Sequence, residues 1–545
     1  MSSEESRIMP NKQVKLKEQA RTALMRGINL VGTAVGSTIG PRGRNAVIGR
    51  TYGPPKITND GVTIAKEIEL ADPFENTGAA IMKDVAERTN EEAGDGTSTA
   101  CVLTQMLMSE GMDHLSAGVN VMALRRGMER AGADAIKELK AMAKMVEDHE
   151  IEEVATIAAE SPELGKIIAD TIRKVGKDGV VTVEESALPG IEAEVVEGME
   201  LKNGWTSPAM VTNVEKMEAE YRDVEILVTD KKLSFLPDIM PFLNSMTNAG
   251  KKALVIVGDV EGEVLKTLLY NKLRGGFAVL AVRPPGYGDD RREILMDIAA
   301  TVGATLVSDE TGITLADAPQ SVLGHAHRVV SKEKSTAIVG GAGKKEEIDA
   351  RIALLKAQAN DIDTKFSKDK ITERIGKLSG GVAIIHVGAA TEGDMTYLKD
   401  KIEDAVNATR AAIEEGIVPG GGAALVKVRA ELLKNVTPDT EGVGYGIVLK
   451  ALQVPLVMIA LNAGKRFKKW YQRTGEIDEI LKFVAEHPVS GYDAVNDRMV
   501  GDMILAGIVD PVKVTRTAVE RAVSASAILI TTEVAIVEAV KDLVK

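Results

Sequence analysis

The feature that most constrains this chain is the stretch Ala93–Ala100, in which two glycines and an aspartate precede three consecutive hydroxyl residues. Apolar residues then recur at helical spacing from Val102 to Leu107, which predicts a helix that starts at the hydroxyl residues. Unpaired N–H groups and the positive end of the helix dipole collect at such a start, and both favour phosphate. Gly-Asp-Gly is also ordinary turn chemistry, and Thr or Ser is an ordinary N-cap. The stretch alone therefore leaves phosphate binding and a plain helix start open.

Asp95 adds a hard oxygen that suits Mg²⁺ held against phosphate oxygens, although the chain has no G-x-x-x-x-G-K-[ST] motif. Three further glycine-rich turns accompany it. Thr38–Asn45 precedes a predicted strand at 46–48, Ile57–Ile64 is predicted as a strand and turn with Asp60 at its tip, and Gly416–Gly422 interrupts a helical pattern. Three consecutive glycines allow a close approach of backbone to a ligand, or close helix packing.

Composition bounds the class of protein. The chain has 545 residues and 44% apolar content, enough for several domains with large cores, and a net charge of −13 argues against a general binder of nucleic acid or anionic membranes. The single cysteine, Cys101, fits a reducing compartment and a packed side chain better than a reactive thiolate. No secretory signal is evident and no apolar run approaches the length of a membrane span. We therefore expect a cytoplasmic protein with no membrane or nucleic-acid partner.

The middle of the chain has a different pattern. Short apolar segments at 253–257, 277–282 and 304–307 alternate with helical patterns at 263–273 and 290–302, which predicts an α/β domain with parallel strands. Charged helices over 344–378 end at Ser379-Gly380-Gly381 before a strand at 382–387, and this glycine pair is either a hinge or a C-cap. A long helix is predicted from 13 to 35, and helical patterns return after 402.

Five segments taken together resemble one family closely. They are Thr38–Asn45, Asn59–Gly61, Gly94–Thr99, Ala408–Gly422 and Asp510–Pro511. In this order they resemble the bacterial-type (group I) chaperonins, the GroEL family, and the resemblance runs from about Lys17 to Glu533. It implies a multidomain α+β and α/β subunit. Residues 1–141 and 415–545 would form a mostly helical equatorial ATP-binding domain, 142–196 and 382–414 a small intermediate hinge domain, and 197–381 an α/β apical domain, with hinges at Gly198 and Gly381.

The resemblance also implies a nucleotide site that takes ATP and Mg²⁺, with K⁺ as a further candidate. Asp404 matches the acid that orients the attacking water, and Asp60 matches a second acid near the terminal phosphate. Asp95 matches the Mg²⁺ ligand. The positions that match nucleotide-binding residues are Thr38, Gly40, Pro41, Asp95, Gly96, Thr97, Ser98, Thr99, Gly421, Asp493 and Asp510.

In the family, the apical domain binds non-native polypeptides and a GroES-type co-chaperonin, and the subunit forms a homo-oligomeric seven-membered ring, usually a double ring. The positions that match its apolar binding surface are Trp205, Ala209, Met210, Met240, Leu243, Leu265, Leu269 and Tyr270. Exposed apolar side chains of this kind mark a docking surface, and flexible methionines suit varied partners.

The sequence departs from the family pattern at several positions. Arg42 and Asn59 stand where lysines are common, Asp493 stands where Asn is common, and Ala209 replaces a usual aromatic residue. The segment 465–470 is strongly basic where the ring-to-ring contact is usually acidic, which indicates an altered interface rather than an RNA or membrane site, given the net negative charge. We expect nucleotide binding to survive these changes.

The function implied is that of an ATP-driven folding chaperone, an ATPase in which hydrolysis times the capture, enclosure and release of non-native chains. An ATP-independent holdase remains an alternative because the ring contact and the apical surface depart from the pattern. A small-molecule kinase that uses the same phosphate loops is a second alternative, although no pocket for an acceptor substrate is evident in the sequence.

Overall fold

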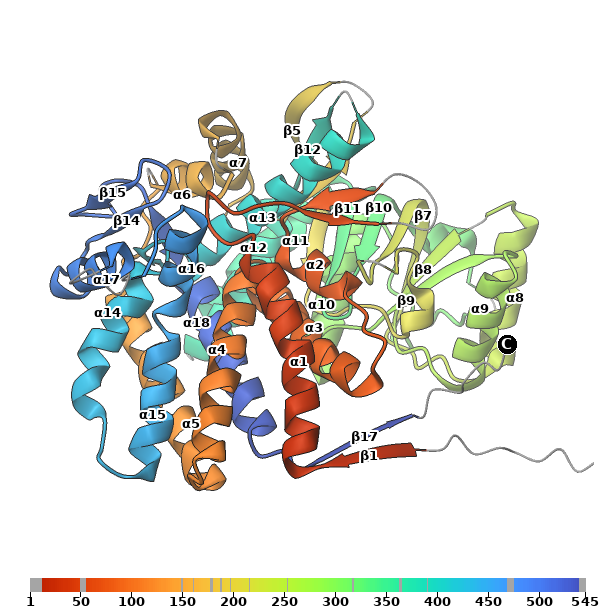
Figure 1. Ribbon diagram of the computed structural model, residues 1–545. Coiled ribbons are helices and arrows are strands. Elements are labelled where there is room, and N and C mark those ends of the chain that lie inside the picture. Colours follow the sequence, from red (N-terminus) through yellow and green to blue (C-terminus); the bar gives the residue numbers. More distant parts are fainter. Residues whose placement is uncertain are drawn as a thin grey trace, which may run out of the picture. The chain divides into compact units, whose positions relative to one another are not determined.

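The computed structural model describes residues 12–538 except 50–54, 149, 160, 177–179, 187–188, 197, 215, 252, 316–317, 362–364, 390 and 468–474. The chain divides into two compact units (Figure 1). Unit 1 comprises Met1–Ile168 and Ala390–Lys545, and unit 2 comprises Ala169–Ala389. The chain thus leaves the first unit and returns to it, as the family resemblance implies.

Unit 1 is built from long helices with small residues at their contacts. α1 packs against α3 and α5 packs against α15, while α18 lies against α3, α4 and α5. The contacts are close because glycines replace larger side chains: a methyl group at Gly127 of α5 would lie 2.0 Å from the Glu441 carbonyl oxygen of α15. The main helices are α1 (Lys17–Gly36), α3 (Pro73–Ala93), α4 (Thr97–Ser116), α5 (Val121–Met142), α14 (Ala423–Leu432), α15 (Thr440–Ala451), α16 (Val454–Asn462) and α18 (Val512–Leu529).

Local sequence explains where several of these helices begin. Asp72 precedes α3, and its carboxylate accepts hydrogen bonds from the N–H groups of Phe74 (2.7 Å) and Glu75 (3.2 Å). Asn120 caps α5 in the same way through Ala123 N–H. These side chains satisfy N–H groups that have no partner inside the helix, which stabilises each start by about 1 kcal/mol.

Shorter elements complete unit 1. Four two-stranded ribbons pair β1 with β17, β2 with β3, β13 with β16 and β14 with β15. The predicted helix over 13–35 is wrong at its start, because residues 12–16 form β1. Unit 1 also contains the long helix α13 (Glu392–Glu415). The short elements are β1 (Lys12–Leu16), β2 (Ala46–Ile48), β3 (Lys56–Thr58), α2 (Gly61–Glu67), α6 (Ile151–Ala159), β13 (Ile417–Pro419), α17 (Glu476–Glu486), β14 (Gly491–Asp493), β15 (Arg498–Val500), β16 (Val509–Pro511) and β17 (Val534–Glu538).

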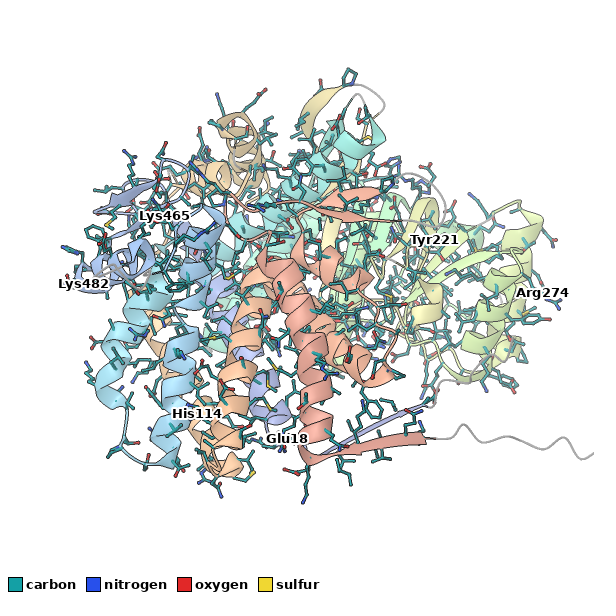
Figure 2. The ribbon with its side chains drawn as sticks, viewed as in Figure 1. Glu18, His114, Tyr221, Arg274, Lys465 and Lys482 are labelled. Carbon is teal, nitrogen blue, oxygen red and sulfur yellow. The ribbon has the colours of Figure 1, made fainter. Side chains whose placement is uncertain are left out.

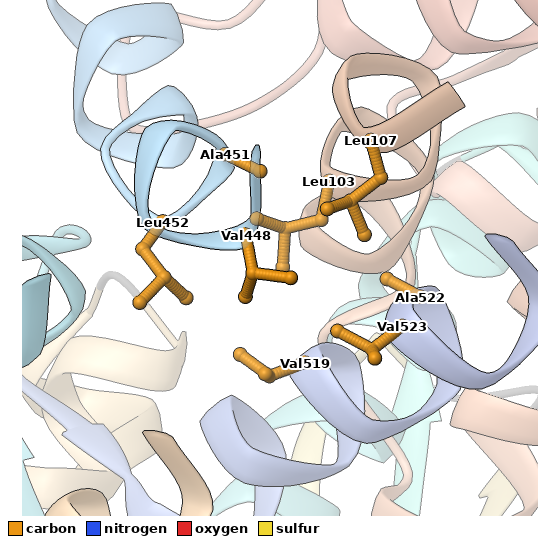
Figure 3. A pocket seen from close by; sticks show the side chains of 8 residues that line it. All are labelled: Leu103, Leu107, Val448, Ala451, Leu452, Val519, Ala522 and Val523. Carbon is orange, nitrogen blue, oxygen red and sulfur yellow. The ribbon is translucent and has the colours of Figure 1, made fainter. Parts of the chain in front are cut away.

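A small gap between α4, α15 and α18 is lined by apolar side chains alone (Figure 3). Leu103, Val448 and Val519 are among its lining residues. The gap has no room for a water molecule, so it is ordinary packing space. Cys101, on the same α4, is also buried, and burial raises the pKa of its thiol to about 12, which leaves it protonated at neutral pH.

One helical stretch, Thr440–Asn462 across α15 and α16, is long and apolar enough to cross a membrane by length and composition. The sequence expectation that no run approaches that length was wrong in this respect. About 67% of its most apolar window is buried inside the protein, and core helices of soluble proteins meet the same criterion. The stretch is therefore weak evidence for a membrane span.

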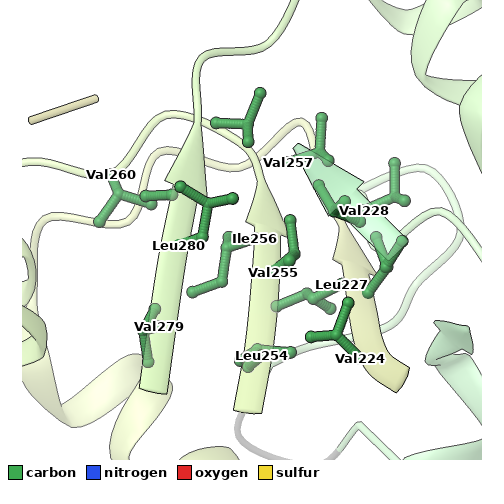
Figure 4. Close-up of a cluster of buried hydrophobic side chains, with 14 of the residues drawn as sticks. Val224, Leu227, Val228, Leu254, Val255, Ile256, Val257, Val260, Val279 and Leu280 are labelled. Carbon is green, nitrogen blue, oxygen red and sulfur yellow. The ribbon is translucent and has the colours of Figure 1, made fainter. Parts of the chain in front are cut away.

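Unit 2 contains a six-stranded mixed sheet in the order β6-β11-β10-β7-β8-β9. β7, β8 and β9 are parallel neighbours, and the other pairs are antiparallel. Their Val, Leu and Ile side chains form a continuous core (Figure 4). The elements are β6 (Gly198–Leu201), β7 (Ala219–Val228), α8 (Leu236–Asn248), β8 (Ala253–Val257), α9 (Gly262–Leu273), β9 (Ala278–Val282), α10 (Gly288–Val302), β10 (Gly324–Ser331) and β11 (Thr336–Gly341).

The predicted alternation of strands and helices is confirmed at β8, α9, β9 and α10, but the strand predicted at 304–307 is wrong. Only Val307 pairs there, in an isolated bridge to Thr229. The predicted strand around Ile57–Ile64 is likewise only half correct, because β3 ends at Thr58 and Gly61 begins α2. Short apolar runs do not by themselves separate strands from buried turns or helices.

A second sheet in unit 2 has the order β4-β12-β5, with β4 (Val180–Glu185) parallel and β5 (Gly190–Val196) antiparallel to β12 (Val382–Gly388). α7 (Pro162–Val175) contains the division between the units. The proposed intermediate domain thus contributes α6 and α13 to unit 1 and this sheet to unit 2. The three-domain division stays a prediction, while the mostly helical unit and the α/β unit agree with the predicted fold class.

A buried ion network fixes α11 (Lys345–Asp361) and α12 (Lys365–Gly380) to α10. The Asp297 carboxylate, which is 2% exposed, accepts hydrogen bonds from Arg351 Nε at 2.7 Å and Arg374 Nε at 2.7 Å. Both guanidinium groups also donate to Glu293. Two arginines on separate helices therefore depend on one buried carboxylate.

We predict that Asp297→Asn destabilises unit 2 by about 3 kcal/mol, because removing the charge leaves two buried guanidinium groups poorly paired. The midpoint of urea unfolding, followed by circular dichroism, measures the change. Asp290→Asn is the matched control on the same helix: its pair with Lys370 is exposed, so the expected loss is under about 1 kcal/mol. Equal midpoints for the two variants would contradict the assigned role of the network.

Candidate functional site

The glycine-rich stretch that opened the sequence analysis forms the turn between α3 and α4. α3 ends at Gly94 (φ 73°), and Gly96 (φ 84°) is the N-cap of α4, so both glycines have the left-handed backbone that other residues rarely adopt. The structure describes no partner for the backbone N–H groups of Thr97, Ser98 and Thr99. Three donors and the positive end of a long helix therefore meet at this turn, which is what a phosphate group requires.

A second helix begins against this turn. Asp60 caps α2, and its carboxylate accepts hydrogen bonds from Val62 N–H (3.2 Å) and Thr63 N–H (2.9 Å). A methyl group at Gly61 would lie 2.5 Å from Ser98 Oγ and 2.9 Å from Thr97 Oγ1. Only glycine allows this approach, so the N-termini of α2 and α4 converge and bring Asp60 toward the hydroxyl cluster.

The turn is enclosed by two further helices. A methyl group at Gly94 would lie 2.5 Å from Asn407 Cβ of α13, and one at Gly96 would lie 2.7 Å from Val514 Cγ1 of α18. Ala93, Ala411 and Val514 form a small apolar cluster beside it. The turn thus packs directly against α13, the helix that carries Asp404 one turn before Asn407.

Asp404 lies among like charges. Burial, and then the negative charges of Asp95, Asp60 and nearby acids on α13, raise its pKa well above the usual range for a carboxyl. Burial and the Asp60 charge also raise the pKa of Asp95, against a hydrogen bond from Gly96 N–H. Both residues are nevertheless exposed to solvent. Exposed carboxylates that repel one another can accept a cation or a cation-bound ligand.

Asp510 reaches the site from the β13–β16 ribbon. Val418 pairs with Asp510 in this ribbon, which sets the carboxylate beside the glycine turn before α14. Gly422 N–H lies 3.5 Å from Asp510 Oδ2, and both Gly421 (φ 63°) and Gly422 (φ 76°) are left-handed. Burial and the charge of Asp95 raise the pKa of Asp510 to about 6, against hydrogen bonds from the two glycines.

The loop after α1 is fixed from two sides. Thr38 is buried and its hydroxyl donates to Val35 O at 2.8 Å, while Gly40 (φ 83°) packs so closely that a methyl group there would lie 2.8 Å from Ile459 Cγ1. Asn462 Nδ2 donates to the carbonyls of Gly36 (3.1 Å) and Ile39 (2.9 Å). Gly40 and Pro41 remain exposed, so the loop offers backbone and the Pro41 ring rather than the Thr38 hydroxyl.

Asp493 has a different environment from the other predicted nucleotide residues. Its buried carboxylate accepts hydrogen bonds from the N–H groups of Val495 (3.1 Å) and Asn496 (3.0 Å) and from Asn496 Nδ2 (2.8 Å). Burial raises its pKa, but these bonds and Arg498 outweigh burial and lower it. The side chain holds its own hairpin together, and Arg42 Nη2 ties the same hairpin to the loop after α1 through Val495 O (2.8 Å).

The donor set fits a magnesium ion that arrives with a nucleotide. In the described part of the chain, no group of three or more His, Cys, Asp or Glu side chains is placed to hold a metal ion. Mg²⁺ takes one or two carboxylates and completes its shell with phosphate and water oxygens. Carboxylates that repel one another beside free helix N–H groups match that requirement.

The sequence matches the TCP-1/cpn60 chaperonin family over residues 31–540. The chain belongs to this family. Its structure is similar to the crystal structure of the chaperonin gp146 from the bacteriophage EL 2 (Pseudomonas aeruginosa), determined in the presence of ATP-BeFx in crystal form II. The TM-score is 0.69 at 20% sequence identity, and the match covers 96% of this chain and 99% of that chain. The predicted GroEL/cpn60-type family and the multidomain fold are therefore confirmed.

The eight positions predicted to form the apical binding surface fall into three groups by burial. Trp205, Met210 and Leu243 are buried in the core of unit 2, where Trp205 Nε1 donates to Met217 O at 3.3 Å. They have almost no accessible surface in this conformation, so they do not form the exposed strip that the resemblance implies. Met240, Leu265 and Leu269 are half-buried against that core, and Ala209 and Tyr270 are exposed.

The two predicted hinge glycines lie where the chain crosses between the two sheets of unit 2. Gly381 (φ 63°) precedes β12, and a methyl group there would lie 3.0 Å from Val196 O at the end of β5. A methyl group at Gly198 would lie 2.6 Å from Val382 Cγ2. The outgoing and returning strands thus run side by side with glycine at both crossings, so both require glycine in this arrangement; their role as hinges stays a prediction.

Sequence reasoning missed two groups of residues at this site. Asn407 contacts the phosphate turn, and its place one helical turn after Asp404 is the signal that could have found it. Lys56 of β3 lies 3.9 Å from Asp400 of α13, one turn before Asp404, and joins the β2–β3 ribbon to the helix of the proposed catalytic acid. No local pattern signals this pair, because its partners are far apart in sequence.

The raised pKa values predict a stability effect. A raised folded-state pKa means that the folded protein binds the proton more readily than the unfolded chain, so stability falls as the pH rises from the unfolded value toward the folded one. Asp404→Asn removes this repulsion and should stabilise the nucleotide-free protein at pH values above the folded-state pKa. The gain should be at most about 1 kcal/mol, because solvent screens the charges. The gain should shrink as the pH falls toward 4.

Thermal unfolding at pH 8 and pH 5 in EDTA measures this effect. Asp394→Asn, at the exposed start of the same helix, should leave the unfolding midpoint nearly unchanged at both values. A midpoint for Asp404→Asn below that of the unaltered protein at pH 8 would show that the carboxylate is not under repulsion.

Proposed function

We propose that this chaperonin hydrolyses ATP at the site between α2, α4 and α13 and uses the cycle to capture and release non-native polypeptides. The observation that carries the proposal is the approach of Asp404, from α13, to the acids at two helix N-termini. Phosphoryl transfer needs positioned charges and an oriented water more than a covalent nucleophile, and this arrangement supplies both.

Each residue has a separate task in this proposal. The N–H groups of Thr97, Ser98 and Thr99 bind the phosphates, Asp95 holds Mg²⁺, and Asp510 accepts the ribose hydroxyls. When bound, Mg²⁺ neutralises charge on the phosphate oxygens. Asp404 orients and deprotonates the attacking water, a task that its raised pKa suits, while Asp60 fixes the start of α2 beside the terminal phosphate.

The position of Asp404 explains how hydrolysis would time the cycle. It lies on α13, while Asp95 and the phosphate-binding amides lie on the α3–α4 turn. A displacement of α13 would remove the acid from the site and leave the amides in place. Nucleotide binding therefore does not require Asp404, but hydrolysis does.

A ring of identical subunits is supported by an apolar surface on unit 1. The β1–β17 ribbon pairs Val14 with Ile536 and Leu16 with Val534, and all four side chains are exposed on one face. The other face packs through Ala535 and Val537 against Phe74. Such an apolar face is suited to be covered by a partner surface, and a second copy of this chain would supply one.

We predict that Asp404→Asn lowers steady-state ATP turnover at least tenfold, because the water loses its base, while the affinity for ATP changes less than threefold. Phosphate release and calorimetric ATP titration in Mg²⁺ measure the two quantities. Asp394→Asn should retain full turnover. If the unaltered protein binds and hydrolyses no ATP yet suppresses aggregation of an unfolded protein, the holdase alternative replaces this proposal.

We also predict that Ile536→Lys reduces the ring to smaller species, because a charge would be buried in the inter-subunit contact. Native mass spectrometry of the variant and the unaltered protein at the same concentration detects loss of the ring and counts the subunits in the unaltered assembly. Lys12→Ala lies on the same ribbon without removing apolar surface and should leave assembly intact. An unchanged ring for Ile536→Lys would place the contact elsewhere.

A further inference from the structure

The C-terminal end of α9 carries a lysine, Lys272, that is not among the positions matched to the family's apolar binding surface. Leu265, Leu269 and Lys272 are spaced i, i+4 and i+7, so they lie along one face of the helix. The Lys272 ammonium donates to the carbonyls of Ala209 and Val211, each at 3.1 Å. These bonds hold the 3₁₀ turn Pro208–Met210 against the end of α9.

The Lys272 ammonium has spare capacity. An ammonium group has three N–H donors, and the described contacts use two of them, both with neutral carbonyls. Within the described residues, no carboxylate pairs with Lys272. Partial burial without a counter-charge lowers its pKa, so a carboxylate from outside the chain would find a charge that is already positioned and partly desolvated.

The charges of α8 and α9 are separated along the helices. Because β7, β8 and β9 are adjacent and parallel, α8 and α9 run in the same direction beside each other (Figure 1). Their acidic residues, Asp238 and Glu263, lie in the first turns. Lys266 of α9 lies about a quarter turn away from the face of Leu265 and Leu269, whereas Lys272 lies on that face in the last turn. The surface is therefore apolar along its length and cationic at one end, on a chain whose net charge is −13.

Exposed apolar groups surround the cationic end. Tyr270 is 52% exposed, Leu273 is 78% exposed, and the Arg274 guanidinium lies over the Tyr270 ring at 4.4 Å from its centroid (Figure 2 labels Arg274). A partner that covers this end of α9 would bury the side chains of Tyr270 and Leu273 and would contact the cations of Lys272 and Arg274. An apolar segment followed by a carboxylate complements all of these features.

We propose that the α8–α9 surface selects extended segments of non-native polypeptide in which apolar residues are followed by an acidic residue, with the carboxylate bound by Lys272. This inference rests on the proposed apical capture of non-native chains. It adds to the proposed capture a direction for the bound chain, with the apolar residues before the acidic one, and a preference for that negative charge. A glutamine in the same place can accept a hydrogen bond from the third donor but leaves the Lys272 charge without a counter-charge, and an apolar or basic residue leaves the donor without a partner.

The test compares two short fluorescent peptides in which leucine alternates with serine, one ending in a glutamate side chain and the other in glutamine, both amidated. Anisotropy titration of the unaltered protein should show about fivefold tighter binding of the glutamate peptide at low salt, with the difference lost at high salt. Lys272→Met, which keeps the aliphatic stem, should bind both peptides with the weaker affinity. Lys266→Met, off this face of α9, should keep the preference.

Each other outcome is decisive. Lys272→Arg keeps the charge and the donors and should retain the preference for the glutamate peptide. If Lys272→Met weakens the binding of both peptides by the same factor, the preference persists without the lysine; the lysine then only supports the turn, and the inference fails. Equal binding of the two peptides by the unaltered protein also overturns it, while capture itself stands. If neither peptide binds and an unfolded protein is not captured either, the failure belongs to the proposed function.

Discussion

The structure of the candidate nucleotide site depends on the close packing of one glycine turn between helices. Gly94 and Gly96 lie against Asn407 of α13 and Val514 of α18 at distances that leave no room for a side chain. This packing fixes the first amides of α4, and it also brings the helix that carries Asp404 into contact with the phosphate turn. A larger residue at Gly94 would push the turn away from α13 and so separate the acid from the amides.

The same packing creates an unfavourable arrangement of charge. Asp60, Asp95, Asp404 and Asp510 influence one another, and burial together with their mutual repulsion raises the pKa values of three of them. The helix N-termini offset only part of this repulsion, because two of the carboxylates remain accessible to solvent. The site is therefore a place where stability is lower than the fold could provide, and a nucleotide bound with its cation would relieve the repulsion.

Unit 2 meets a different constraint, because it keeps a continuous apolar core beneath the surface proposed to receive non-native chains. Its parallel strands and the side chains of Trp205 and Met210 form the core, which leaves the half-buried faces of α8 and α9 as the surface. Lys272 joins the two parts, since its ammonium holds the turn after Trp205 and faces the end of that surface. Two glycine crossings separate this region from the smaller sheet.

The sequence by itself determined the family, the helices and strands with strong periodicity, and the residues that form the phosphate turn. Glycines with a required backbone conformation and capping side chains act over a few residues, so their signals are local. The pairings that give the site its chemistry were decided by the tertiary structure: Asn407 against Gly94, Lys56 beside Asp400, and Lys272 on two distant carbonyls. The burial of Trp205 and Met210 was decided there too, because it depends on strands that lie elsewhere in the chain. The bonds of Asp493 are local, to Val495, Asn496 and Arg498, but the hairpin that makes them is not evident from residue pattern alone.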